Sequence, residues 1–324
     1  RRAVRAFEPD VIHGHDWLSR SVLPRVVSGS IPVVTSLHYY TRTCAKKTLW
    51  RDDEVCAGPS LRQCLRCAGD HYGSAKGAVV TLGLRAGAAL EDRRSASYVS
   101  VSAATAEGNS LDHGPGSVPA SVVVANPLAP GALQATNGAA VVPETIPDGP
   151  FVLFVGDLRP EKGIRVLLAA VERLRQQGCS VPLVLVGEKT SDGLEVPVDT
   201  IETGQVDHDV VQAIWRRATV GVVPSLWPEP FGLVAIEAMA AGCPLVASSV
   251  GGLAEILADD RGVLVPPGDP TALAGAIGDL LTDEPRRQTV AERAKASLER
   301  YDLDLIVDGI EAQYRAAIDG NRGR

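Results

Sequence analysis

Two glutamates, Glu229 and Glu237, stand close together in the second half of the chain. Prolines flank Glu229 on both sides and stiffen the segment before an apolar, helix-like run that contains Glu237. Gly232 lies at the first turn of that run, where free backbone N–H groups and the lack of a side chain would let an anion approach closely. One carboxylate on a loop and one on a helix could then accept hydrogen bonds from sugar hydroxyls.

Each glutamate, taken alone, also has a structural explanation. Glu229 could pack at a turn, and Glu237 could face solvent on its helix. Glu237, however, lies between Ile236 and Ala238 in a strongly apolar segment, and a buried carboxylate without a partner is costly. The two residues together therefore favour a ligand site.

A basic loop precedes these glutamates in the chain. Arg159 and Lys162 lie in residues 156–163, between an apolar run at 151–155 and a helical pattern. In open α/β sheets ligands bind at the carboxyl ends of strands, and arginine and lysine are the side chains that hold phosphate. The loop suits an anion, although a solvated turn with Glu161 near a helix N-terminus explains the same residues.

The elements that position these residues alternate between short apolar runs and helical patterns, as in parallel α/β sheets. Residues 127–150 are rich in Ala, Gly, Pro, Thr and Asn and are expected to be a linker. A full series of strand–helix units follows over 151–300, and a shorter series precedes it over 1–126. We therefore expect an α/β protein with two doubly wound domains, the first incomplete, and a final helix at 301–324 that packs back on the first domain.

A polar, aperiodic insertion interrupts the first domain at about residues 40–77 and contains four cysteines. The last two form a C-x-x-C pair, a chelate spacing that suits tetrahedral zinc. Free thiols, or disulfides in an oxidising compartment, are the alternatives. The four residues are Cys44, Cys56, Cys64 and Cys67.

The composition excludes several classes of protein. With 39 acidic and 32 basic residues the net charge is −7, which disfavours a nucleic-acid partner. Hydrophobic residues make up 45% and charged residues 22%, as in ordinary globular proteins. The apolar runs are shorter than the roughly 18 residues that a membrane span needs. We expect a cytoplasmic protein with reduced thiols and no transmembrane segment, and leave peripheral membrane contact open.

The motifs of the second half, in their order and spacing, resemble the retaining glycosyltransferase family 4, whose members have the GT-B fold. The resemblance covers about residues 151–281 and rests on four motifs: E-K-G, P-S-x-x-x-E-P-F-G-x-x-x-x-E-A-M-A-x-G, V-G-G-L-A-E-I and G-V-L-V-P-P-G-D-P. The first domain resembles the family more loosely, at residues 9–16 and 35–38. The register implies that the chain starts inside the first domain of such an enzyme, without its opening strand and glycine-rich loop.

The resemblance implies a glycosyltransferase with two Rossmann-like domains facing a cleft. Such an enzyme transfers a sugar from a UDP- or GDP-linked donor, with retention of configuration, to a glycan, lipid-linked or small-molecule acceptor. The departing phosphate takes the acceptor proton, so that no further cofactor or metal is required. An epimerase or phosphorylase of the same fold, or a nucleotide-binding remnant without activity, are the alternatives.

The resemblance also assigns roles to individual residues. Lys162 would bind the donor diphosphate, Glu229 the sugar hydroxyls and Glu237 the ribose. His38 would stand near the donor sugar, with His15 as the alternative, so that His38, Glu229 and Lys162 are the expected catalytic residues.

One position departs from the family pattern. Asp157 stands where the family commonly has an arginine, and Arg159, two residues on, is expected to take its place. Backbone N–H groups would complete the donor site around three residues: Phe231, Gly232 and Leu233.

Overall fold

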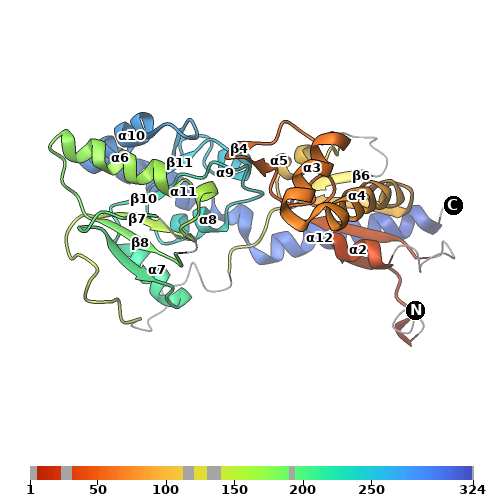
Figure 1. Cartoon of the computed structure of the whole chain (residues 1–324). Helices are drawn as coiled ribbons and strands as arrows, with labels where there is room; N and C mark the ends of the chain where they lie inside the picture. Colours follow the sequence, from red (N-terminus) through yellow and green to blue (C-terminus); the bar gives the residue numbers. More distant parts are fainter. Residues whose placement is uncertain (1–5, 23–30, 112–119, 130–139, 190–193, 323–324) are drawn as a thin grey trace. The chain divides into compact units, whose positions relative to one another are not determined.

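The chain folds into two compact units, described here in a computed structural model. The first unit combines Arg1–Asn126 with Asp304–Arg324, and the second unit comprises Pro127–Leu303. Figure 1 shows both units and labels their helices and strands where there is room. The structure describes the following stretches of the chain: residues 6–22, 31–111, 120–129, 140–189 and 194–322.

A parallel sheet of four strands, in the order β1-β2-β5-β6, forms the centre of the first unit. Because consecutive residues of a strand point to opposite faces, Tyr98 packs with Leu37 on one face while Val99 packs with Ala317 on the other. The short apolar runs of the sequence are therefore strands covered on both sides. The strands are β1 (Ile12–His15), β2 (Val33–Leu37), β5 (Ser95–Ser100) and β6 (Ala120–Val123).

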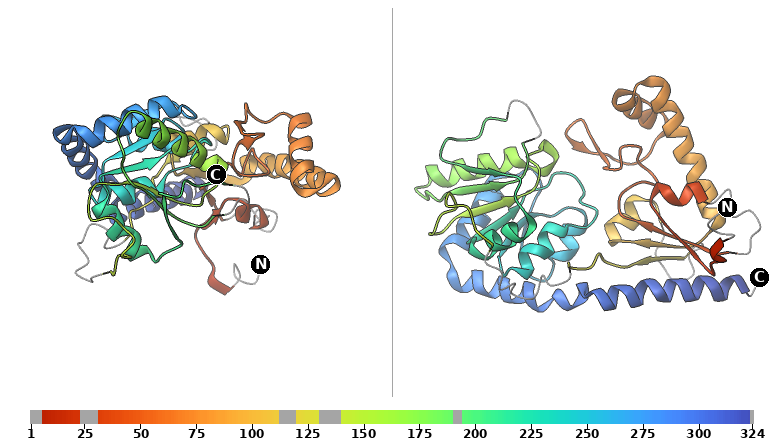
Figure 2. Two further views of the ribbon diagram at one scale, coloured as in Figure 1. Left: turned by 60° about the vertical axis from the view of Figure 1, so that its left-hand side comes forward. Right: turned by 90° about the horizontal axis from the view of Figure 1, so that it is seen from below.

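Helix α12 (Leu303–Arg322) covers one face of this sheet although it lies at the other end of the chain. Ile310, Tyr314 and Ala317 recur at the spacing of one helix stripe, and they pack against residues of β2, β5 and β6. The right-hand view of Figure 2 shows α12 lying along the sheet of the first unit. Two short helices, α2 (Trp17–Val22) and α5 (Ala103–Gly108), follow β1 and β5.

The insertion between β2 and β5 is more regular than its composition indicates. A hairpin of β3 (Trp50–Arg51) and β4 (Glu54–Val55) is followed by α3 (Leu61–Tyr72), and α4 (Ser74–Arg94) begins directly after Gly73. The prediction of an aperiodic segment up to residue 77 was wrong over α3, whose Ser60 caps the helix by accepting from Gln63 N–H. Two cysteines of the insertion therefore lie on a helix.

The second unit is built on a parallel sheet of six strands in the order β12-β11-β10-β7-β8-β9. The apolar strands β8, β10 and β11 are buried along their whole length. Edge strand β9 was missed in the sequence because its Ile-Glu-Thr-Gly pattern is half exposed. The strands are β7 (Val152–Val155), β8 (Leu183–Val186), β9 (Ile201–Gly204), β10 (Val220–Val223), β11 (Leu245–Ser248) and β12 (Val263–Val265).

Helices alternate with these strands, as expected for a doubly wound domain. Helices α6 and α10 pack against one hydrophobic core with β7, β8 and β10. The helical elements of the second unit are η2 (Pro160–Lys162), α6 (Ile164–Gln176), α7 (His208–Arg217), α8 (Leu233–Ala240), α9 (Gly251–Ile256), α10 (Pro270–Thr282), α11 (Glu284–Ala296) and η3 (Leu298–Tyr301).

The expected linker at residues 127–150 falls within the second unit. Its residues 130–139 lie outside the described part of the chain. On either side of them, Leu128 and Ile146 are buried, and Leu128 N–H donates to Tyr301 O at 2.9 Å. Among the described residues, no helix is both long and apolar enough to cross a bilayer.

Candidate active site

The chain order reverses between two neighbouring strands of the second unit. From β7 the chain moves outward to β8 and β9, and it then returns to β10 on the other side of β7. In open α/β sheets the loops that leave the strands at such a switch point form the ligand site. The two loops are residues 156–163, after β7, and residues 224–232, after β10.

The loop after β7 is anchored at both ends. Leu158 is buried and its N–H donates to Glu188 O at 2.9 Å. Gly163 has a φ of 76°, and a Cβ at this position would lie 1.8 Å from Pro224 O. Only glycine permits this approach, which brings the end of η2 against the loop after β10. Lys162 is the residue carried toward that loop.

The loop after β10 is held by backbone contacts on two sides. Leu226 N–H donates to Glu161 O at 2.9 Å, and Gly252 N–H donates to Glu229 O at 2.8 Å. A Cβ on Gly251 would lie 2.1 Å from Glu229 O, so the glycine pair at the start of α9 fits directly under Glu229. The V-G-G motif therefore positions the P-E-P segment.

These contacts bring Lys162 and Glu229 together. Lys162 Nζ lies 2.5 Å from Glu229 Oε1, and Ser225 Oγ donates to the same oxygen at 2.9 Å. The side chain of Glu229 is 8% exposed and that of Lys162 is 30% exposed, so the pair sits at a boundary between protein and solvent. Two residues that are distant in the sequence thus form one charged centre at the switch point.

The ring of Trp227 lies next to this pair. Lys162 Nζ lies 5.2 Å from the centre of the Trp227 ring, within the range of a cation–π contact. The indole Nε1 is buried and has no hydrogen-bond partner among the described residues. Ser225 and Trp227 stand inside the P-S-x-x-x-E-P-F-G motif, but sequence reasoning gave neither a role, because motif membership does not reveal contact with Lys162.

Helix α8 begins at the end of the same loop. Gly232 is its N-cap, with a φ of 113° and no side-chain hydrogen bond to the cap. Phe231 is buried with its ring edge-to-face against Tyr301, and Leu233 is about half exposed. Because the first N–H groups of a helix lack intrahelical acceptors, this end of α8 offers donors and a positive dipole next to Glu229.

Glu237 lies in the second turn of α8 and is partly buried. Burial raises its pKa, and the charge of His208, at the start of α7, acts in the opposite direction. Desolvation is the larger of the two effects, and it raises the pKa because it disfavours the carboxylate form. Glu237 is therefore a partly desolvated acceptor on the same helix whose N-terminus adjoins Glu229.

Arg159 lies close to two carboxylates of its own loop, which the sequence did not predict. Its Nε lies 3.4 Å from Asp157 Oδ2 and its Nη1 3.9 Å from Glu161 Oε1, with half of the side chain exposed. Exposed pairs of this kind are weak, so they leave the guanidinium available to an incoming anion. Asp157, where the family commonly has an arginine, is thus a partner of Arg159.

The histidines expected near the reaction lie in the first unit, at the carboxyl ends of β1 and β2. His15 Nδ1 lies 2.9 Å from His38 Nε2, and the two rings are stacked. Burial lowers the pKa of His38, and Asp16 partly opposes this effect. Because one ring must donate and the other accept, the contact does not allow both nitrogens to be protonated.

A third histidine, His13, joins this group. Its Nδ1 lies 2.7 Å from Tyr314 Oη of α12, and its Nε2 lies 2.7 Å from Ser36 Oγ. Burial, followed by the charges of His15 and His38, lowers the pKa of His13 to about 4. The ring is therefore neutral near pH 7, and it links the C-terminal helix to the histidine pair. No sequence signal indicated Tyr314.

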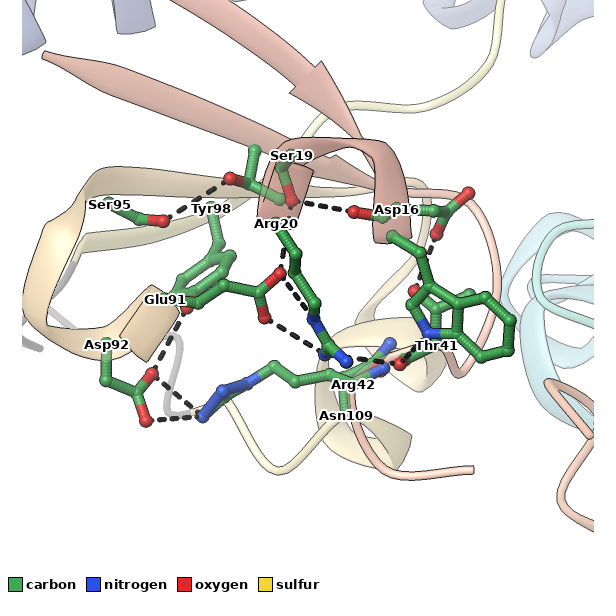
Figure 3. A network of polar contacts seen from close by, with 12 residues as sticks. Asp16, Ser19, Arg20, Thr41, Arg42, Glu91, Asp92, Ser95, Tyr98 and Asn109 are labelled. Carbon is green, nitrogen blue, oxygen red and sulfur yellow. Dashed lines mark hydrogen bonds and ion pairs between the residues drawn. The ribbon is translucent and has the colours of Figure 1, made fainter. Parts of the chain in front are cut away.

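A polar network fixes the segment that carries His38 (Figure 3). Asp16 Oδ1 accepts from His38 N–H at 3.2 Å and from Thr41 Oγ1 at 2.8 Å. Arg20 donates to Thr41 O and forms an ion pair with the buried Glu91 of α4 at 2.8 Å. The loop after β2 is thus tied to α2 and α4, which holds His38 in place.

Comparison with known proteins identifies the family. The family model of glycosyl transferases group 1 matches residues 141–297. Glycogen synthase of Mycobacterium tuberculosis (strain H37Rv) is 31% identical over 334 residues, which cover 98% of this chain and 71% of that protein. The chain belongs to the glycosyl transferases group 1 family.

Other relatives of this glycosyltransferase match a smaller part of it. D-inositol 3-phosphate glycosyltransferase of Salinispora tropica is 36% identical over 194 residues, covering 54% of this chain and 40% of that protein. Among solved structures, Anabaena HepE in complex with UDP and glucose matches with a TM-score of 0.62 at 22% identity over 96% of this chain and 79% of that chain. Sucrose-phosphate synthase from Thermosynechococcus elongatus matches with a TM-score of 0.64 at 24% identity, covering 97% and 75%. These likenesses confirm the GT-B fold.

The matched region of the glycosyltransferase contains the whole charged centre of the second unit. Lys162, Glu229 and Glu237 all fall inside residues 141–297, together with Arg159. The described geometry brings Lys162 into contact with Glu229, and α8 joins Glu229 to Glu237. His15 and His38 lie outside the matched region and are in contact with each other in the first unit.

Proposed function

We propose that this glycosyltransferase transfers a sugar from a nucleoside-diphosphate sugar to an acceptor, with retention of anomeric configuration. The observation that carries the proposal is the contact between Lys162 and Glu229 at the switch point of the second unit. A cation next to a hydroxyl-accepting carboxylate matches the two ends of such a donor, a diphosphate and a sugar. UDP and GDP are the nucleotides that we expect, and HepE, which has the same fold, is known with UDP and with UDP-glucose.

The charged pair gives each end of the donor a partner. Lys162 would turn from Glu229 to the diphosphate, and Arg159 would add a second positive charge. Glu229, released from Lys162, would accept hydrogen bonds from the sugar hydroxyls while Ser225 keeps it in position. A buried carboxylate needs such partners, because its desolvation is otherwise uncompensated.

Helix α8 would hold the remaining parts of the donor. The N–H groups around Phe231, Gly232 and Leu233 would bind the sugar and phosphates, where the positive end of the helix dipole favours anions. Glu237, one turn further on, would accept hydrogen bonds from the ribose. The cap itself requires glycine, because its φ is 113° and a Cβ there would lie 2.6 Å from the Leu253 side chain.

The chemical step follows from these placements. The bond between the anomeric carbon and the phosphate oxygen breaks, and the acceptor oxygen bonds to the same face of the sugar. The acceptor proton passes to the departing phosphate oxygen. Lys162, Arg159 and the N-terminus of α8 would stabilise the negative charge of the leaving group. Positioning and charge stabilisation then carry the catalysis, and no metal ion enters the step. We propose that His38, with His15 as the alternative, stands near the donor sugar during this step.

The test separates the roles of the two charged residues. Titration calorimetry with UDP and GDP shows which nucleobase the protein prefers. We expect Lys162→Ala to weaken binding of the preferred nucleotide by about 10- to 100-fold, which corresponds to the loss of one charge-assisted hydrogen bond. Glu229→Gln is expected to leave nucleotide affinity unchanged or raised, because it frees Lys162, and to reduce turnover of the sugar donor.

Matched controls lie on the surface of the same unit. Lys295→Ala removes an exposed lysine of α11, and Glu172→Gln removes an exposed carboxylate of α6; both should behave like the wild type. NMR of the product reports the anomeric configuration. Unchanged nucleotide binding in Lys162→Ala, or an inverted product, would contradict the proposal, and donor conversion that needs no acceptor would indicate an epimerase.

A further inference from the structure

The four cysteines of the insertion line one cavity. It has a volume of about 30 Å³ and is bordered by Cys44, Cys56, Cys64 and Cys67. Such a volume holds one water molecule or one ion, since a single water needs roughly 10–15 Å³ of this kind of space. All four are free thiols and partly buried. Four cysteines that are far apart in the insertion therefore border one small space.

The local structure explains this convergence. Cys44 lies before the hairpin, and Cys56 lies directly after β4, where its N–H donates to Leu49 O at 2.7 Å. Cys64 and Cys67 are one turn apart on α3, so they share a helix face. The segments on either side of the hairpin and helix α3 thus each bring two cysteines to the cavity.

In the metal-free chain the surroundings disfavour the thiolate forms of Cys64 and Cys67. Burial is the main cause that raises the pKa of Cys64 and of Cys67, and the neighbouring Cys44 and Cys56 raise both further. Three cations act in the opposite direction: Arg85 on Cys64, and Lys46 and Arg51 on Cys67. Lys46 and Arg51 also line the cavity. A bound cation would keep the sulfurs ionised, and these side chains would balance the remaining negative charge.

The insertion has little else to stabilise it. In residues 44–67, all of which the structure describes, Leu49 is the only buried apolar side chain. The hairpin strands have two residues each, and Lys47 and Leu49 hold φ values of 69° and 48°. Short segments without a core of their own are commonly stabilised by a metal or a disulfide.

We propose that Cys44, Cys56, Cys64 and Cys67 bind one Zn²⁺ ion that fixes the fold of the insertion. Four thiolates are the ligand set of structural zinc, and soft sulfur excludes Mg²⁺ and Ca²⁺. Binding replaces four S–H bonds by four Zn–S bonds and releases four protons to solvent. In the described part of the chain no three His, Cys, Asp or Glu side chains already stand in the arrangement of a metal site. The thiols must therefore rotate inward around the cavity as the ion enters.

The metal content of the unmodified chain is the first test. The full chain, expressed in zinc-supplemented medium, freed of any affinity tag and passed over a desalting column, should carry about one zinc ion per molecule by plasma mass spectrometry. Replacement by Co²⁺ should give the intense visible absorption of tetrahedral cobalt with sulfur ligands. A colourless, zinc-free chain would overturn the proposal, as would the brown colour of an iron–sulfur cluster.

Variants locate the ion. Cys67→Ser and Cys44→Ser should each reduce the zinc content to near zero, and both should lower the melting temperature. Cys179→Ser is the matched control, because Cys179 is a partly buried thiol of the second unit outside the cavity, and it should keep one zinc ion. Zinc retained by the Cys44→Ser, Cys67→Ser double variant would place the metal elsewhere. A mass lower by two hydrogens per bridge, measured on the wild-type chain without reductant, would show disulfides instead.

This test is independent of the proposed sugar transfer. Metal content and the cobalt spectrum are read on the unmodified protein, so a variant that fails to fold does not decide the outcome. Failure of nucleotide binding would leave the zinc result unchanged, and absence of zinc would leave Lys162 and Glu229 as proposed.

Discussion

The residues of the charged centre constrain which ligand can bind. Glu229 is nearly buried, and its contacts are Lys162 and Ser225. A ligand that takes Lys162 away must give Glu229 new hydrogen-bond donors, because an uncompensated buried carboxylate costs several kcal/mol. A molecule that carries both an anion and neighbouring hydroxyls meets this requirement, whereas either group alone does not. The pair thus favours an intact nucleotide sugar over its separate halves.

Also at the residue scale, His13 should make stability depend on pH. Its pKa is about 4 in the folded chain and 6.5 as the ordinary value. Between these values the unfolded chain binds the proton more readily, so the free energy of unfolding rises with pH and the full contribution is present above pH 6.5. We expect a loss of roughly 1–2 kcal/mol on going from pH 7 to pH 4, because the half-buried ring is partly screened by solvent.

Urea denaturation at a series of pH values measures this effect. In His13→Gln the free energy of unfolding should rise less steeply with pH between pH 4 and 6.5 than it does in the wild type. His71→Gln is the control, since His71 is exposed in the same unit. Equal slopes for His13→Gln and the wild type would show that His13 is not the group that titrates.

At the scale of elements, Gly163 decides whether the two loops of the site can meet. Alanine there would need both a positive φ and a Cβ that overlaps Pro224 O. We expect Gly163→Ala to destabilise the protein by about 3 kcal/mol or more and to weaken nucleotide binding, because η2 must withdraw from the loop after β10. Calorimetric titration and urea denaturation report the two effects.

Gly178 supplies the matched comparison. It follows the C-cap of α6 with a φ of 85°, and a Cβ there would have nothing within 4 Å. Gly178→Ala should therefore cost only the backbone strain, about 1 kcal/mol, and leave nucleotide binding intact. If the two alanine variants are equally stable and bind equally well, the close approach at Pro224 does not position Lys162.

The same elements show how far sequence reasoning reaches. The apolar runs predicted the parallel sheets, and the glycines and prolines placed Lys162 and Glu229 at strand ends. Their direct contact was not predictable, because it depends on the order of β7 and β10 in the sheet. Helix α3 was missed although Leu61, Leu65 and Ala68 recur at helical spacing, because the segment was interpreted from its polar, cysteine-rich composition. Strand β9 was missed because edge strands are only half buried.

At the scale of the whole molecule, the first unit is discontinuous in the chain. The four strands of its parallel sheet end by Val123, yet one face of that sheet is covered by α12, which the chain forms only after it has completed the second unit. Burial of Val34 and Val99 therefore depends on a helix from the opposite terminus. The second unit, a continuous segment, has no such dependence, so damage to α12 should affect the units unequally.

A substitution at Ala317 can measure how differently the two units depend on α12. It is buried between α12 and the sheet, whereas its neighbour Ala316 is exposed. Ala317→Glu places a charge without a partner against Val34 and Val99, which should destabilise the first unit by about 3 kcal/mol or more, while Ala316→Glu should change stability by less than about 0.5 kcal/mol. Hydrogen exchange distinguishes the units: β1, β2, β5 and β6 should lose protection in Ala317→Glu, and β7, β8, β10 and β11 should keep it. Uniform loss of protection would mean that the two units unfold together, and α12 would then couple their stabilities instead of supporting the first unit alone.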